Sequence, residues 1–203
     1  METTQTDASL LQEMQKEKAK DKVLAMWFFI SAEVVIFGGL FGVYLTLKSH
    51  TGSGPSPEGL FELKETAVST IVLLSSSFTC AMAGYFLQAK NKKNMIFMLL
   101  LTLLLGMGFL GLEIKEFLTY VEKGYRITDS SFLASFYLLT GTHGSHVLAG
   151  CIWMLLLLFH MVREGLNEDT SLKIKVFSLY WHFVDVVWVF IFTVVYLFGK
   201  LSS

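Results

Sequence analysis

The sequence contains five stretches in which apolar residues continue for longer than a soluble protein needs. They run over about residues 23–47, 67–89, 94–118, 131–162 and 172–199. A helix needs about 20 mostly apolar residues to cross the hydrocarbon core of a bilayer, and each stretch reaches that length. With 53% hydrophobic residues among 203, the chain is too apolar for a soluble domain of its size. The sequence therefore predicts an all-α integral membrane protein, a bundle of five transmembrane helices.

The polar segments set the expected topology. Residues 1–22 are polar and mixed in charge, so we predict an amino-terminal tail followed by one transmembrane domain over residues 23–200. The tail forms either a short helix on the membrane surface or a disordered segment. Of the 16 Lys and Arg residues, ten lie in the tail and the loops on its side, and six lie on the other side. The positive-inside rule then places the amino terminus, with its tail, in the cytoplasm and the carboxyl terminus outside.

Net charge and proline positions exclude other classes of protein. A formal net charge of -1 provides no basic surface for nucleic acid. Pro55 and Pro57 are the only prolines and both lie in one loop, so the predicted helices lack proline kinks. We therefore expect long, regular helices rather than the broken helices of many transporters. Small residues at Gly38, Gly42 and Gly106 indicate places where helices approach closely.

Three of the five stretches carry ionisable groups near their middle. A charged side chain at that depth costs about 2.5–3.5 kcal/mol, so such residues usually face a partner. Residues three apart on a helix point into one sector, so a histidine pair and a His–Asp pair should each face one neighbour. At about 1.5 Å per residue, all of these groups lie at similar depth and can meet. They are Glu33, His143, His146, His182 and Asp185.

The residues alone leave three interpretations of the histidines open. Two pairs on facing helices could supply four ligands to a metal ion. A haem would need a histidine from each of two helices, since residues three apart on one helix cannot bind both faces of a porphyrin. The third interpretation, which we favour, is hydrogen bonding between helices, with Thr140, Thr142 and Ser145 as nearby partners.

The glutamates predict different environments. Glu33 has only Ser31 as a polar neighbour in sequence, so hydrocarbon should favour its neutral acid. It either serves proton transfer or a lipid head group, or makes one hydrogen bond between helices. Glu113 and Glu116 flank Lys115 near the end of the third stretch, which predicts an ion cluster at the membrane interface.

Four strings resemble subunit III of the haem–copper respiratory oxidases: AEVVIFGGLF, GFLGLEIKEF, FYLLTGTHGSHVLAG and SLYWHFVDVVWVFIFTVVYL. The resemblance covers about residues 24–199. It implies that the chain itself holds no redox centre and no metal. It also implies a complex whose subunit I carries haem and copper, reduces oxygen to water and pumps protons, with subunits II and IV as further partners. The five-helix form resembles that of bacteria, which implies the plasma membrane.

Shorter strings bear on the electron donor. GTHG at 141–144 and SSFTC at 76–80 resemble the quinol oxidase branch. The alternatives are subunit III of a cytochrome c oxidase, an accessory subunit of a nitric oxide reductase and, in a different class, a stand-alone proton-coupled carrier.

The resemblance also implies roles for single residues. Glu33 matches a family glutamate beside a cleft that holds phospholipid, where it would support proton uptake and the stability of subunit I. Between its two glutamates the family usually has an aromatic residue, where this chain has Ile114 and Lys115. The remaining intramembrane polar residues would be structural: His143, His146, His182, Asp185 and Glu113.

Overall fold

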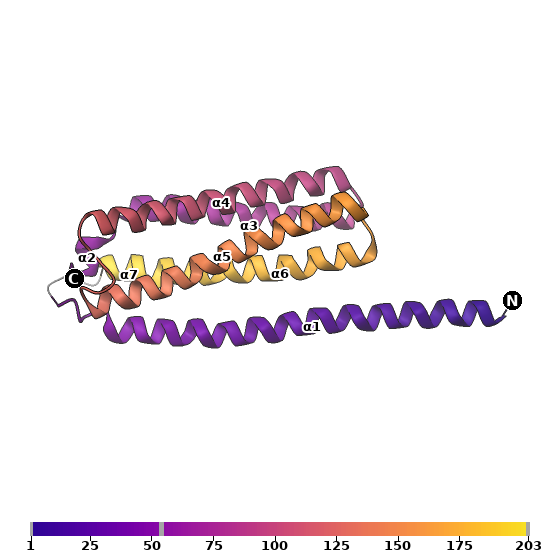
Figure 1. Ribbon diagram of the computed structural model, residues 1–203, viewed down its shortest axis with the longest axis horizontal. Helices are drawn as coiled ribbons and strands as arrows, with labels where there is room; N and C mark the ends of the chain where they lie inside the picture. The colour runs from indigo at the N-terminus through magenta and orange to yellow at the C-terminus, as the bar shows by residue number, and fades with distance from the viewer. Residues whose placement is uncertain (1, 53–54, 202–203) are drawn as a thin grey trace.

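A computed structural model describes residues 2–52 and 55–201 and shows five long helices (Figure 1). Each is long and apolar enough to cross a membrane, which confirms the predicted five-helix fold. Short helices α2 and α7 lie at the end of the bundle that carries the carboxyl terminus. The bounds are α1 Glu2–Leu47, α2 Pro57–Leu60, α3 Leu63–Gln88, α4 Lys92–Glu122, α5 Ser131–Glu164, α6 Glu168–Ile191, the π-helical segment η1 Phe192–Leu197, and α7 Phe198–Leu201.

The amino-terminal segment is helical and continuous with the first long helix, rather than a tail separate from it. From residue 2 onward it continues α1, which projects well beyond the other helices (Figure 1). Residue 1 and the side chains of residues 2–12 and 15 lie outside the part of the chain that the structure describes.

Side-chain caps and one glycine place the turns between helices. Asn91, Ser130 and Asn167 accept hydrogen bonds from backbone N–H groups at the starts of α4, α5 and α6. Helix α5 ends at Gly165, whose φ of 74° favours a residue without a side chain. Because only three residues separate α5 from α6, the two helices run antiparallel and in contact.

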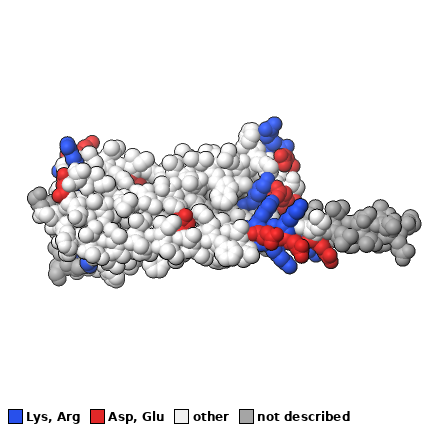
Figure 2. All heavy atoms as spheres, turned by 60° about the horizontal axis from the view of Figure 1, so that its bottom comes forward, with Lys and Arg blue, Asp and Glu red and all other residues white. Residues whose placement is uncertain are grey.

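The helices form layers. Helices α3 and α4 pack together on one side of the bundle, α5 and α6 lie in the middle, and α1 packs against α5 and α6 on the far side (Figure 1). On the face shown in Figure 2, the length of the bundle is almost free of charge, while Lys and Arg gather at the end from which α1 projects. A smaller charged group lies at the opposite end. This distribution fits a protein surrounded by hydrocarbon.

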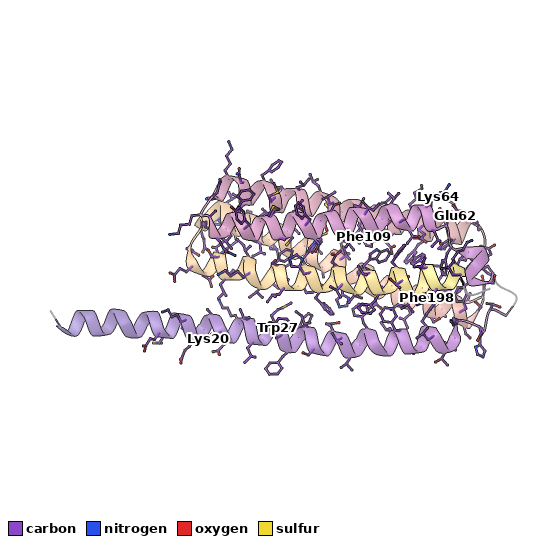
Figure 3. All side chains as sticks on the ribbon, turned by 180° about the vertical axis from the view of Figure 1, so that it is seen from behind. Lys20, Trp27, Glu62, Lys64, Phe109 and Phe198 are labelled. Carbon is purple, nitrogen blue, oxygen red and sulfur yellow. The ribbon has the colours of Figure 1, made fainter. Side chains whose placement is uncertain are left out.

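Aromatic side chains fill the interior. Trp181 of α6 lies between two glycines, because a Cβ added at Gly106 would lie 2.8 Å from its Cη2 and one at Gly150 would lie 2.7 Å from its Cζ3. Phe109 of α4 lies between the α3/α4 layer and α6 (Figure 3), with its ring 4.7 Å from that of Trp188. The glycines thus let three helices close around one large ring.

Two predictions about the helices are wrong in part. Gly38 and Gly42 do not mark a contact within this chain, since no other described atom lies within 4 Å of a Cβ added at either. The last span is not regular either, because Phe192–Leu197 is π-helical. There the Tyr44 hydroxyl of α1 donates to the Val195 carbonyl at 3.5 Å. A π-helical turn is uncommon and widens the helix locally.

Candidate functional site

Glu33 and His146 meet across the contact between α1 and α5, here called the α1 seam. Glu33 Oε2 lies 3.1 Å from His146 Nε2, and the two side chains are only 12% and 19% exposed. The other ring nitrogen, Nδ1, lies 2.8 Å from the Thr142 carbonyl oxygen. Phe37 covers the imidazole, with ring centroids 5.2 Å apart. The carboxyl and the imidazole are therefore a hydrogen-bonded pair shielded from water.

The geometry of this pair fixes where its protons can be. A carbonyl oxygen only accepts, so Nδ1 of His146 carries a hydrogen and donates it to Thr142. Nε2 and the Glu33 carboxyl then have one further proton between them: either the acid donates to a neutral imidazole or an imidazolium donates to a carboxylate. The proton can sit on either group while the hydrogen bond is kept, whereas its loss would leave two acceptors facing each other.

Sequence reasoning placed His146 among the groups that could meet Glu33 but did not single it out as the partner. The expected polar neighbour of Glu33, Ser31, instead donates to the Trp27 carbonyl at 2.8 Å. His146 lies 113 positions away in the chain, and only the shared depth of the two residues in their helices indicated a contact. The direction in which each residue points round its helix was not available from the sequence.

An apolar groove adjoins the α1 seam. Two neighbouring hollows of about 430 and 340 Å³ share Met26, Phe29 and Trp153. Tyr180 lines the second hollow and donates its hydroxyl to the His146 carbonyl at 2.8 Å, which connects the groove to the pair. We call this the α1 groove; Lys22 and Lys173 lie at its other end.

His143 has a different environment from the one predicted. It is fully buried, and neither ring nitrogen has a hydrogen-bond partner among the described residues. The ring stacks on Trp188 at 5.1 Å and meets the edge of Phe109 at 5.8 Å. The predicted hydroxyl partners donate to their own helix instead: Thr140 to Phe136, Thr142 to Leu138 and Ser145 to Thr142.

His182 and Asp185 face α3 rather than the other histidines. His182 Nδ1 lies 2.7 Å from Ser77 Oγ, a partner that sequence reasoning missed within its run of three serines. Asp185 is 6% exposed, and its Oδ1 is buried without a partner among the described residues. Of the five groups expected to meet, Glu33 and His146 do so, whereas His143, His182 and Asp185 do not join them among the described residues. Within residues 2–52 and 55–201, no group of three His, Cys, Asp or Glu side chains is placed to hold a metal ion.

The pair Glu113 and Glu116 does not form the predicted ion cluster. Glu113 is 3% exposed, and both of its carboxyl oxygens are buried without a described partner. Glu116 accepts from Tyr120 at 2.5 Å and from Tyr196 at 3.4 Å. Both acids face the interior because they lie three apart on α4, whereas Lys115, one of the two residues between them, points out toward Glu65.

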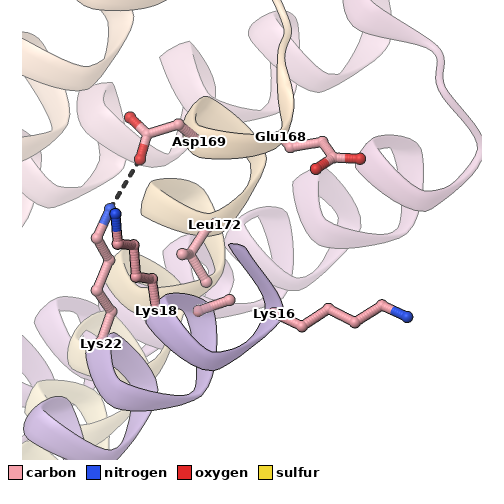
Figure 4. A pocket seen from close by; sticks show the side chains of 7 residues that line it. Lys16, Lys18, Lys22, Glu168, Asp169 and Leu172 are labelled. Carbon is pink, nitrogen blue, oxygen red and sulfur yellow. Dashed lines mark hydrogen bonds and ion pairs between the residues drawn. The ribbon is translucent and has the colours of Figure 1, made fainter. Parts of the chain in front are cut away.

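Charged residues line a further hollow at the end where α1 projects. It has a volume of about 480 Å³ and lies between α1 and the start of α6 (Figure 4). Lys22 and Lys173 each lie 2.7 Å from the Asp169 carboxylate. These side chains are about one third to one half exposed, so their ion pairs are solvated and contribute little stability. Lys16, Lys18 and Glu168 complete this charged rim.

Comparisons with known proteins identify a family that matches most of the chain. The cytochrome c oxidase subunit III family matches residues 5–200. The chain is 49% identical over 185 residues to cytochrome c oxidase subunit 3 of Bacillus sp. (strain PS3), covering 91% of this chain and 89% of the relative. It is 44% identical over 187 residues to quinol oxidase subunit 3 of Bacillus subtilis (strain 168), covering 92% of each.

A third relative extends the match almost end to end. The chain is 43% identical over 199 residues to the probable quinol oxidase subunit 3 of Staphylococcus saprophyticus, covering 97% of this chain and 98% of the relative. Five apolar helices and these relatives make the chain a multi-pass bacterial membrane protein and part of a multi-subunit terminal oxidase complex. It belongs to the cytochrome c oxidase subunit III family.

Proposed function

We propose that the chain is the non-catalytic third subunit of a proton-pumping haem–copper oxidase, and that Glu33 is its functional carboxyl. Subunit I would hold the haem and copper and reduce oxygen to water, with subunits II and IV completing the complex. The observation that carries the proposal is the Glu33–His146 pair, which holds one transferable proton in the middle of the bundle. A proton relay needs a group of this kind, and an intramembrane carboxyl is a functional candidate by default.

The α1 groove supports a lipid-binding role. Its walls are apolar residues of α1, α5 and α6, and its far end carries the ammonium groups of Lys22 and Lys173. An acyl chain fits the apolar part. A lipid phosphate would compete with Asp169, which lies 2.7 Å from each of the two lysines, as their partner. An occupant of the groove would contact Tyr180, whose hydroxyl donates to the backbone carbonyl of His146.

Quinol is the proposed electron donor of the complex. Two of the relatives above, from Bacillus subtilis and Staphylococcus saprophyticus, are named as quinol oxidase subunits. The strings GTHG and SSFTC favour the same branch. The alternative is cytochrome c, which is favoured by the 49% identity to the Bacillus sp. (strain PS3) protein.

The proposed orientation puts the projecting end of α1 in the cytoplasm. That end carries ten of the 16 Lys and Arg residues in its helix ends and loops. A reporter fused after residue 203 tests this: alkaline phosphatase should be active there and a cytoplasmic fluorescent protein should not. The reverse pattern would contradict the orientation.

Purification through this chain tests the proposal as a whole. The complex should contain a haem-bearing partner, show a haem spectrum and consume oxygen faster with quinol than with reduced cytochrome c. If the chain instead comes out alone and colourless, the oxidase assignment fails. Faster turnover with cytochrome c would overturn the donor only.

Replacing Glu33 tests the role of the seam. Glu33→Ala should leave haem content unchanged but shorten the time for which the complex sustains oxygen consumption. Glu113→Gln is the matched control, because it alters an intramembrane acid that has no described partner. An immediate and complete loss of activity in Glu33→Ala, or equal shortening in both variants, would contradict a supporting role for Glu33.

A further inference from the structure

The three histidines in the middle of the bundle differ in how their ring nitrogens are used. His146 has a partner at both nitrogens. His143 has none, but it is fully enclosed by aromatic rings. His182 uses only Nδ1, toward Ser77, and its ring is partly exposed on the side of the bundle. Among the described residues, Nε2 of His182 has no partner, and it is the free mid-span imidazole nitrogen that another molecule can reach.

His182 lies on the outer edge of the contact between α3 and α6. The inner row of this contact joins Trp181 to Ser76 at 3.1 Å. The next residue of each helix forms the outer row, where His182 meets Ser77 at 2.7 Å. Asp185, one turn further along α6, places its carboxyl beside Ser77. Ser77, His182 and Asp185 therefore form a small polar cluster at the outer surface of the bundle.

This polar cluster is at the depth of the bilayer centre. His182 lies 14 residues after the start of the last span at Glu168 and 19 before its end at Leu201. At about 1.5 Å per residue, these separations are about 21 and 28 Å. Neither water nor lipid head groups reach that depth, and hydrocarbon chains offer no hydrogen bond. On this flank, a polar side chain of another protein helix can satisfy the ring nitrogen, whereas lipid tails cannot.

The surface around His182 is otherwise apolar. Leu74 and Phe78 of α3 are 44% and 66% exposed, and Val186 and Val189 of α6 are 52% and 40% exposed. An apolar helix surface with one hydrogen-bonding group at its centre is the pattern by which membrane helices recognise each other. The exposed flank of α5 differs, because its hydroxyls at Thr142 and Ser145 donate to carbonyls of their own helix.

We propose that the α3–α6 flank, defined by Leu74, Ser77, His182 and Val189, is the surface on which a transmembrane helix of another oxidase subunit docks. That helix presents a polar side chain at mid-membrane depth to Nε2 of His182. The proposal rests on the proposed function in one respect, namely that the chain works within an oxidase complex. The exposed flank of α5 faces lipid.

Photocrosslinking in the native membrane tests the docking surface. A benzophenone amino acid replaces Leu74 or Val189 on the proposed surface, and Leu138 or Leu148 on the α5 flank as controls of similar exposure. The first two positions should give adducts with another subunit of the haem-bearing complex, several-fold above the controls. Adducts from the α5 positions alone, adducts with a second copy of this chain, or lipid adducts alone at Leu74 and Val189 would overturn the proposal.

Two substitutions test the hydrogen bond itself. His182→Leu should lower the fraction of the chain retained by the purified complex after a detergent wash by about threefold, the effect of losing one interhelical hydrogen bond. Ser145→Ala is the control, because it removes a mid-span hydroxyl on the α5 flank, outside the proposed surface. Equal retention of wild type and His182→Leu would contradict a role for Nε2, as would equal loss in both variants.

The outcomes separate this inference from the proposed function. If the wild-type chain purifies with a haem-bearing partner but crosslinks only from α5, the docking surface is wrong and the oxidase assignment stands. If the chain purifies without any haem-bearing partner, the proposed function itself fails.

Discussion

At the α1 seam, Glu33 has a histidine partner and an adjoining groove, whereas inside the α3–α6 bundle Glu113 has neither. The space around the glycines shows that the two regions also differ in packing. Gly38 on α1 has no described neighbour within 4 Å of an added Cβ, while Gly150 on α5 lies directly against Trp181. The interior is tightly packed and holds its acid out of reach, so it serves as a scaffold. The seam is looser, which fits the role in proton exchange and lipid contact that we propose for Glu33.

The largest expected effect concerns packing. Gly150→Ala places a methyl group 2.7 Å from the buried Trp181 ring, so it should lower the free energy of unfolding by about 1–3 kcal/mol. Gly38→Ala meets open space and should leave stability unchanged or raise it by up to about 1 kcal/mol, because Ala favours helix. Reversible unfolding in mixed detergent micelles measures both. Equal losses would contradict the difference in packing.

Replacing each glutamate by Met should change stability in opposite directions. Glu33→Met leaves His146 Nε2 unpaired and should cost about 1 kcal/mol. Glu113→Met removes a buried acid that has no described partner, so stability should be unchanged or rise by about 1 kcal/mol. The same unfolding assay measures both variants. A loss in Glu113→Met larger than that in Glu33→Met would show that the interior acid is the one with the important partner.

A double-mutant cycle gives the smallest effect. The coupling free energy between Glu33→Met and His146→Leu should be about 0.6 kcal/mol, and at most about 1.7 kcal/mol, as for other interhelical hydrogen bonds. The matched cycle between Glu113 and His143 should give a coupling near zero, because neither side chain has a described hydrogen-bond partner. Couplings of equal size in the two cycles would contradict the claim that Glu33 has a hydrogen-bond partner and Glu113 has none.

Some features of the molecule follow from the sequence and others do not. The number of helices follows because a span needs a set length of apolar residues, and five stretches supply it. The depth of Glu33 and His146 follows from their place within those stretches. Their pairing does not, because it depends on which helix lies beside which and on how each is rotated.

Glu113 is a residue whose environment could not be predicted from its sequence neighbours. Its sequence neighbour Lys115 suggested an ion cluster, but helix geometry turns Glu113 and Glu116 inward together and sends Lys115 out to Glu65. Likewise, small residues predicted close helix contacts at Gly38 and Gly106 alike, but among the described residues Gly38 makes none, while Gly106 does. Small residues indicate that a close contact is possible, and the rest of the fold decides where it forms.

Labelling with a hydrophobic carbodiimide tests most directly whether Glu33 is the functional carboxyl. The reagent reaches protonated acids from the lipid phase, and mass spectrometry of the purified complex measures how much label each glutamate carries. Glu33 should be labelled in large excess over Glu113, the label should disappear in Glu33→Gln, and labelled complex should lose its activity during sustained turnover. Equal labelling of the two residues, or unchanged turnover after Glu33 has been fully labelled, would contradict the assignment.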